Sequence, residues 1–182
     1  TDKWSVIDAR NRSDFESFTV AGYDPLDTTK LLVLAHNGRN TQGLWSFDPQ
    51  ENEFTELLYG RSDGDVVAVR MHSNSYAEPD LITGVAFYDG RQRKFEWFDG
   101  QEKAIYEQLE SLIPFADRFR IVDRSRDGNT MIIENSGPRD PGTFYLLKNS
   151  ELNVVGSAKP AIASKNLADV KAITYESSDG MK

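Results

Sequence analysis

The stretch that decides the fold is Asp27–Asp48. It begins with the polar turn Asp27–Lys30, continues with the apolar run Leu31–Ala35 and ends, after a loop that contains Gly38, with the aromatic-containing run Gly43–Asp48. Short apolar and aromatic runs between turn residues are typical of antiparallel strands that are joined by hairpins. The stretch therefore predicts two paired strands.

The same order of features recurs in two further copies. In the clearer copy, the turn Asp127–Asn129 precedes Thr130–Ile133, and a loop with Gly and Pro leads to Gly142–Leu147. Between the two clear copies, Asp80–Tyr88 and Lys94–Phe98 form a degenerate one. Three similar units of about 45–55 residues, each built from short antiparallel strands, are typical of propeller blades. The alternative is a β-sandwich whose hairpins are similar by chance.

Strand signals extend over most of the chain, whereas only one stretch has helical periodicity. From Gln101 to Ile113 the apolar residues recur at helical spacing, and Pro114 ends the pattern. The sequence therefore predicts an all-β fold, namely a partial β-propeller of about three blades with one helical insertion near 101–113. The predicted strands are Phe18–Tyr23, Leu31–Ala35, Leu44–Phe47, Phe54–Tyr59, Val66–Val69, Leu81–Tyr88, Lys94–Phe98, Phe119–Val122, Thr130–Ile133, Thr143–Leu147 and Leu152–Val155.

Composition limits the possible functions. The 182 residues carry 21 Lys and Arg against 29 Asp and Glu, a formal net charge of −8, so nucleic acid is not expected as a partner. The lack of Cys excludes a disulfide framework, a thiol nucleophile and a Cys-ligated zinc site. No apolar run approaches the roughly 18 residues of a membrane span, and no signal peptide follows Thr1. We therefore expect no membrane partner, and whether the chain is cytoplasmic or periplasmic stays open.

Gly60–Gly64 matches the G-x-S-x-G pattern of serine hydrolases, with Ser62 at the nucleophile position. That chemistry needs the serine on a sharp turn between a strand and a helix, next to an oxyanion hole. Here the β-branched run Asp65–Val69 follows, which predicts a strand, and the carboxylate of Asp63 would repel a developing oxyanion. We interpret the motif as a polar loop between blades.

Asp123–Glu134 matches the template of a calcium-binding loop. Its ligand positions hold Asp123, Ser125, Asp127 and Glu134, and Gly128 occupies the sharp turn. The template expects helices on both sides, whereas the flanking runs predict strands, and two arginines would add positive charge beside the cation. An Asp-Gly turn that closes a hairpin explains the same residues. We therefore expect neither a metal ion nor a cofactor.

The two histidines, His36 and His72, do not complete a catalytic or a zinc site, because no reactive serine and no third ligand accompany them. We expect His36, which follows a strand, to make a strand-end hydrogen bond. A set of aromatic residues in the strands could form a stacking platform, but packing between blades explains them better. These residues are Trp45, Phe47, Phe87, Phe95, Trp97, Phe98, Phe144 and Tyr145. We name no catalytic, cofactor-binding or metal-binding residue.

Four stretches share motifs with one known family. Leu44–Asp48 has an aromatic–x–aromatic–Asp pattern, Phe119–Gly128 has a Ser–x–Asp–Gly turn between two strands, Asp140–Leu147 is like Pro-Gly-x-Tyr-Tyr-Leu, and Val170–Lys182 contains Tyr–x–x–x–Asp-Gly. On these motifs the sequence resembles the propeller domain of the prolyl oligopeptidase family of serine peptidases, especially its acylaminoacyl-peptidase and dipeptidyl-aminopeptidase-like members. The last two stretches in tandem are the most specific part.

The resemblance implies a role without chemistry of its own. In this family a C-terminal α/β-hydrolase domain carries the Ser-Asp-His triad, and the propeller caps the active site and restricts access to short peptides. The resemblance implies a partial propeller at 1–168, with blades at roughly 14–60, 65–113 and 117–158, and a connector toward a peptidase domain at 169–182. The expected partners are that peptidase domain and its short peptide substrates. A stand-alone propeller that acts as a protein-interaction scaffold is the alternative, and a hydrolase that uses Ser62 directly is a third option.

The chain opens on Thr1 rather than Met, and it holds about three blades where the family usually has seven or eight. We therefore expect the C-terminal part of a propeller, excised from a longer protein. Each blade buries its faces against its neighbours, so a partial array leaves two apolar end faces uncovered. Because such faces favour association, we expect the chain to dimerise or to repack its terminal segment.

Overall fold

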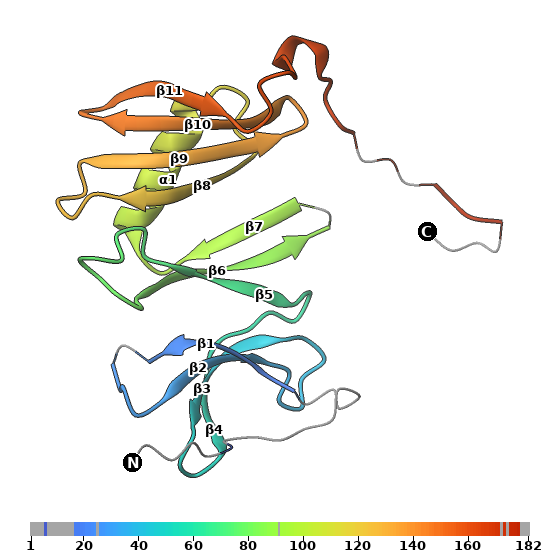
Figure 1. Ribbon diagram of the computed structural model, residues 1–182. Coiled ribbons are helices and arrows are strands. Elements are labelled where there is room, and N and C mark those ends of the chain that lie inside the picture. Colours follow the sequence, from blue (N-terminus) through green and yellow to red (C-terminus); the bar gives the residue numbers. More distant parts are fainter. Residues whose placement is uncertain are drawn as a thin grey trace. The chain divides into compact units, whose positions relative to one another are not determined.

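The computed structural model describes residues 6, 17–24, 26–90, 92–171, 173 and 175–178. The chain divides into two compact units, Thr1–Glu102 and Lys103–Lys182, and each is described by itself. Strands dominate both units (Figure 1). The elements are β1 (Thr19–Tyr23), β2 (Leu31–Ala35), β3 (Gly43–Asp48), β4 (Glu53–Tyr59), β5 (Val66–Met71), β6 (Ile82–Asp89), β7 (Gln92–Trp97), α1 (Gly100–Leu112), β8 (Arg118–Arg124), β9 (Thr130–Gly137), β10 (Asp140–Lys148), β11 (Glu151–Ser157) and the 3-10 helix η1 (Ser164–Asn166).

Each strand pairs with its neighbours in the sequence, so all three sheets are antiparallel meanders. The first unit contains the sheets β1-β2-β3-β4 and β5-β6-β7, and the second contains β8-β9-β10-β11. Tight turns permit this order. Between β10 and β11, Asn149 and Ser150 have φ values of 52° and 66°, the left-handed region that type I′ hairpin turns require. Gly128 has a φ of 76° in the turn between β8 and β9.

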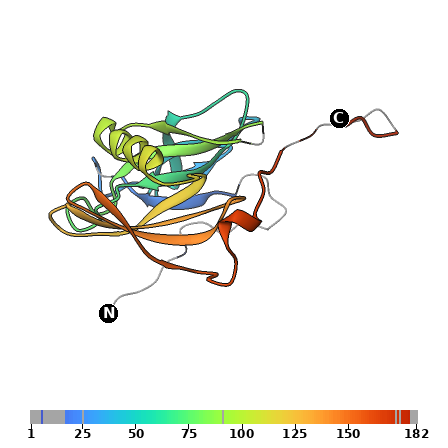
Figure 2. The ribbon, with the colours of Figure 1, turned by 90° about the horizontal axis from the view of Figure 1, so that it is seen from above.

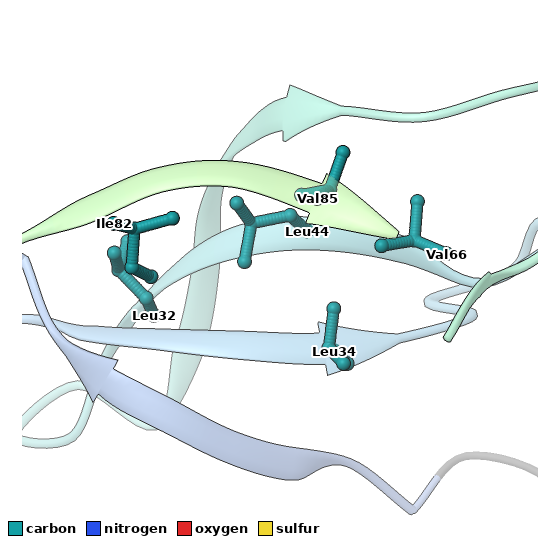
Figure 3. Packing of buried hydrophobic residues seen from close by; sticks show 6 residues of the cluster. All are labelled: Leu32, Leu34, Leu44, Val66, Ile82 and Val85. Atoms are coloured by element: carbon teal, nitrogen blue, oxygen red, sulfur yellow. The ribbon is translucent and has the colours of Figure 1, made fainter. Parts of the chain in front are cut away.

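The core of the first unit lies between its two sheets. Side chains of β2 and β3 face side chains from the second sheet across this layer (Figure 3). The strands β2 and β6 are buried along most of their length, and β2 is continuously apolar rather than alternating. The buried residues of the layer are Leu32, Leu34, Leu44, Val66, Ile82 and Val85.

In the second unit, α1 covers one face of the β8–β11 sheet (Figure 2). Residues two positions apart on a strand share a face, as Met131 and Ile133 of β9 do. Residues four positions apart share one side of a helix, as Leu109 and Ile113 do in α1 and just after its end. The buried core residues of this unit are Leu109, Ile113, Met131, Ile133, Tyr145 and Leu147.

The all-β fold with one helical insertion is confirmed: the described residues form three antiparallel meander sheets, consistent with a partial propeller-like fold, and the helix α1 at Gly100–Leu112. Each predicted strand is present, and most extend further than predicted. The β5–β7 sheet has the three strands predicted for it, and α1 follows β7. One detail differs. The loop predicted before Gly142 is reduced to Pro138 and Arg139, because β9 extends to Gly137 and β10 begins at Asp140, which pairs with Gly137.

Parts of the predicted domain boundaries fall on residues that are not described. Residues 14–16 of the predicted first blade, and 172, 174 and 179–182 of the predicted connector, lie outside the described residues. The described strands of the three sheets run over Thr19–Tyr59, Val66–Trp97 and Arg118–Ser157.

Leu44→Ala is expected to lower the free energy of unfolding by about 2–5 kcal/mol, because it leaves a cavity between the two sheets of the first unit. The matched control is Leu26→Ala, which we expect to change it by less than about 0.5 kcal/mol. Leu44 is 1% exposed, whereas Leu26 is 96% exposed. Urea titration followed by circular dichroism measures both. Equal losses in the two variants would contradict the position of Leu44 in the core.

Candidate functional site

One histidine, one serine and one glutamate meet in the first unit, in a group that we call the His–Ser–Glu cluster (His72, Ser73 and Glu102). His72 and Ser73 directly follow β5, and Glu102 lies in the first turn of α1. The side chain of Glu102 is 1% exposed. Because Ser73 and Glu102 are 29 positions apart, only the fold brings them together.

The carboxylate of Glu102 is surrounded by donors. Ser73 donates its backbone N–H to Oε2 at 2.9 Å and its hydroxyl to Oε1 at 2.8 Å. Nε2 of His72 lies 3.5 Å from Oε1. The backbone N–H of Asn74 lies 3.1 Å from Nδ1 of His72, and Nε2 faces Glu102. These partners offset the high cost of burying a carboxylate.

Backbone hydrogen bonds hold both sides of the cluster in place. Oδ1 of Asn74 accepts from the N–H groups of Tyr76 and Ala77 at 3.2 Å each, which closes the loop after β5. The carboxylate of Asp99 accepts from the N–H of Glu102 at 2.9 Å, as a helix N-cap does. The loop and the first turn of α1 therefore have defined conformations where they meet.

The order of the groups decides what the cluster can do. A serine nucleophile needs the imidazole beside its hydroxyl, with the carboxylate on the far side of the ring. Here the carboxylate of Glu102 accepts from the hydroxyl of Ser73 and also faces His72. The hydroxyl of Ser73 thus donates to a carboxylate and not to an imidazole. The cluster ties the loop after β5 to the start of α1.

Ser62 lies in the loop between β4 and β5, and a strand follows it. Arg61 beside it forms a 2.6 Å ion pair with Asp63, and its guanidinium lies 3.9 Å from the ring centroid of Phe87. The strand-to-helix turn that a nucleophilic serine needs is therefore not formed. As interpreted from the sequence, Gly60–Gly64 is a loop between two strands.

The stretch Asp123–Glu134 forms the end of β8, a turn and the start of β9. The hydroxyl of Ser125 donates to Asp127 at 2.6 Å, and this hydrogen bond is the main cause that lowers the pKa of Asp127. Glu134 forms a 2.6 Å ion pair with Arg120 across the β8–β9 pair. Among the residues that the structure describes, no group of three or more His, Cys, Asp or Glu side chains is placed to hold a metal ion.

The aromatic residues range from buried to half exposed. Phe47 is buried, and its ring centroid lies 4.8 Å from that of Phe18 and 5.3 Å from that of Phe54, as expected for core packing. Phe98 follows the end of β7 and is half exposed, and its ring centroid lies 5.9 Å from that of Tyr59 in β4 of the neighbouring sheet.

His36 begins the turn after β2. Its backbone carbonyl accepts a hydrogen bond from the N–H of Arg39 at 3.0 Å. The strand-end hydrogen bond expected from the sequence is thus made by the backbone of this residue.

A second buried polar cluster, which sequence reasoning missed, lies in the second unit. Asp140 accepts from the side-chain amide of Asn135 at 2.7 Å, from the N–H of Gly142 at 2.9 Å and from the hydroxyl of Thr143 at 2.8 Å. Asn135 accepts in turn from the N–H of Asp117 at 3.3 Å. The Asp-Pro-Gly sequence was the available signal, since Asp often bonds to the backbone two residues ahead. The cluster fixes the start of β10.

Comparison of the chain with known protein families, curated proteins and solved structures gave no match. Within the described ranges, no helix is long and apolar enough to span a membrane. The possible chemistry of the described side chains therefore follows from their own geometry.

Glu102→Ala is expected to lower the free energy of unfolding by about 2–3 kcal/mol, because it removes the buried acceptor of two hydrogen bonds from Ser73. The control is Glu110→Ala, the same substitution at an exposed position of α1, which should change it by less than about 0.5 kcal/mol. Thermal unfolding followed by circular dichroism compares the two. A loss as small as the control's would mean that the cluster does not hold the loop and helix together.

Proposed function

We propose that the chain is part of the propeller domain of a prolyl-oligopeptidase-type serine peptidase. In that role it covers the active site of an α/β-hydrolase domain encoded outside these 182 residues, and it filters substrates by size. The basis is steric, because a short flexible peptide passes a capped entrance and a folded protein does not. The chain contributes no catalytic residue of its own.

The observation that carries the proposal is the position of the family-like motifs in the sheets. The Ser125–Gly128 turn joins β8 to β9, the Asp140–Leu147 stretch lies in β10, and Leu44–Asp48 lies in β3. The resemblance implies that the turn joins two strands and that the other two stretches lie in blade strands, which agrees with these positions. The match of motif and position supports a propeller of this family over a sandwich.

The chemistry of the described serines also supports a shielding role. The hydroxyl of Ser73 is held by Glu102 at 2.8 Å, and Ser62 lies in a loop that leads into a strand. A serine peptidase needs a hydroxyl that donates to an imidazole. Neither serine has this arrangement, so the proposal assigns catalysis to the other domain.

The proposal is tested on the protein that the natural gene encodes. We expect the reading frame to continue into a hydrolase domain with a G-x-S-x-G strand-to-helix turn and a later histidine. Deleting residues 17–168 from that protein should allow cleavage of long unfolded polypeptides. Retained cleavage of a short peptide is the control that the hydrolase domain folds. The lack of such a domain, or an unchanged size preference, would overturn the proposal.

The 182-residue chain is expected to show no labelling by a fluorophosphonate probe, because the hydroxyl of Ser73 donates to Glu102 and Ser62 lies in a loop that leads into a strand. A known serine peptidase, labelled in parallel and gel-imaged, is the positive control. If labelling occurs and Ser62→Ala abolishes it, the chain is itself a hydrolase and the shielding role is wrong.

The second candidate function is a stand-alone propeller that acts as a protein-interaction scaffold. It is favoured by the exposed aromatic side chains Tyr76, Tyr88 and Phe98 in the first unit, which suit protein contacts. A reading frame that stops soon after residue 182 would favour this candidate over the peptidase.

A further inference from the structure

The chain after β11 returns to the end of the sheet where β10 begins. We call the segment Ala158–Asp169 the strap. At its first residue, the backbone N–H of Ala158 donates to the carbonyl of Gly142 in β10 at 2.7 Å. At its last residue, Oδ2 of Asp169 lies 3.6 Å from Nη1 of Arg139, in the turn between β9 and β10. Both ends of the strap are therefore held at the same place in the second unit.

Little apolar surface holds the strap between its ends. The structure describes all of its residues, and none of them is buried or belongs to the apolar core of the second unit. Its internal hydrogen bonds are local, such as that from the N–H of Ile162 to the carbonyl of Lys159 at 3.0 Å. Burial of apolar surface is the main force that holds segments to a folded protein. The polar contacts at the two ends therefore decide whether the strap stays closed.

The two ends differ in how firmly they are held. The first end continues the pairing of β10 with β11, and the hydroxyl of Ser157 also donates to the carbonyl of Gly142 at 3.2 Å. At the second end, the ion pair between Arg139 and Asp169 is the only hydrogen bond or ion pair found among the described residues. We therefore expect the strap to open from Asp169.

Arg139 is held in position before it meets Asp169. Its guanidinium carbon Cζ lies 4.6 Å from the ring centroid of Phe115, which is the distance of a cation–π contact. An exposed ion pair normally contributes little, because both side chains lose freedom when they meet. Here the stacked guanidinium of Arg139 has less freedom to lose, so the pair is more favourable than one between two free side chains.

The backbone of Phe115 adopts a costly conformation. Its φ of 55° lies in the left-handed region, which a bulky residue rarely adopts. The fully buried side-chain amide of Asn135 stabilises this conformation, since it donates to the carbonyl of Phe115 and accepts from the N–H of Asp117, each at 3.3 Å. The ring of Phe115 is 53% exposed, so its own burial gains little. Backbone strain of this kind concentrates where a side chain has a task, and the contact of this ring is with Arg139.

We propose that Arg139, supported by Phe115, is a latch that closes the strap through its ion pair with Asp169. In the closed state, the chain leaves the second unit beside the β9–β10 turn, and in the open state it is released from that turn. Because the ion pair is exposed, ionic strength sets the balance between the two states. The inference is independent of the proposed function, since it concerns only residues of this chain.

Cleavage by a protease that cuts after lysine measures how often the strap opens, because a protease needs a locally released chain. Lys165 lies in η1 within the strap, whereas Lys171 follows the strap and serves as the internal reference. Arg139→Gln is expected to raise the ratio of cleavage at Lys165 to that at Lys171 roughly twofold to fivefold, as the loss of an exposed ion pair implies. Mass spectrometry of the fragments gives both rates, and an unchanged ratio would overturn the latch.

Two further variants test the pair itself. Asp169→Asn should raise the ratio as much as Arg139→Gln does, and the double variant should raise it no further, because the contact is already lost. Arg118→Gln is the control, since Arg118 is 79% exposed and its ion pair with Asp117 lies outside the strap. Additive effects in the double variant, or an equal rise in the control, would show that the two residues do not act as a pair.

Salt distinguishes an ionic latch from a merely structural contact. Raising the ionic strength from about 0.01 M to about 1 M shortens the Debye length from about 30 Å to about 3 Å. The cleavage ratio of the original chain should rise toward that of the Asp169→Asn variant, whose own ratio should stay constant. The ratio corrects for the effect of salt on the protease, which is common to both lysines. An original chain that does not respond to salt, or a variant that responds as strongly, would overturn the proposal.

Discussion

The apolar layer between the β1–β4 and β5–β7 sheets is the interaction on which the first unit depends. A sheet of three or more strands needs an apolar face to be stable, and here that face is covered by the other sheet. Each large aliphatic side chain buried in the layer, such as Leu44 or Val85, contributes about 1.5–3 kcal/mol. An exposed ion pair such as Lys94–Asp89 contributes about 0–1 kcal/mol. The layer therefore outweighs the surface charges in holding the sheets together. In the second unit α1 provides the corresponding cover.

The two buried carboxylates explain how polar groups shape this fold. Glu102 and Asp140 are both buried, and both accept hydrogen bonds from backbone and side-chain donors. Because these donors offset the cost of burying the charges, the carboxylates hold a loop and the start of a strand in position.

The sequence was sufficient for the strands and the helix, because both follow from local patterns. Short apolar runs between turns predict strands, and the spacing from Gln101 to Ile113 predicts a helix, whatever the rest of the chain does. The polar clusters were not predictable. Glu102 meets Ser73 across 29 positions, and no local pattern encodes that contact. The middle sheet has three strands, as the sequence pattern between Val66 and Phe98 predicts.

The most direct test of the account is a methyl NOE measurement on the 182-residue chain. In a stack of blade-like sheets, the methyl groups of Leu32 lie against those of Ile82, and the methyl groups of Leu44 lie against those of Val85, as they do in Figure 3. We predict strong NOEs between Leu32 and Ile82 and between Leu44 and Val85, which join the first sheet to the second. Their absence, together with NOEs from Leu44 to methyl groups of β9 or β10 instead, would contradict the stacking of the two sheets.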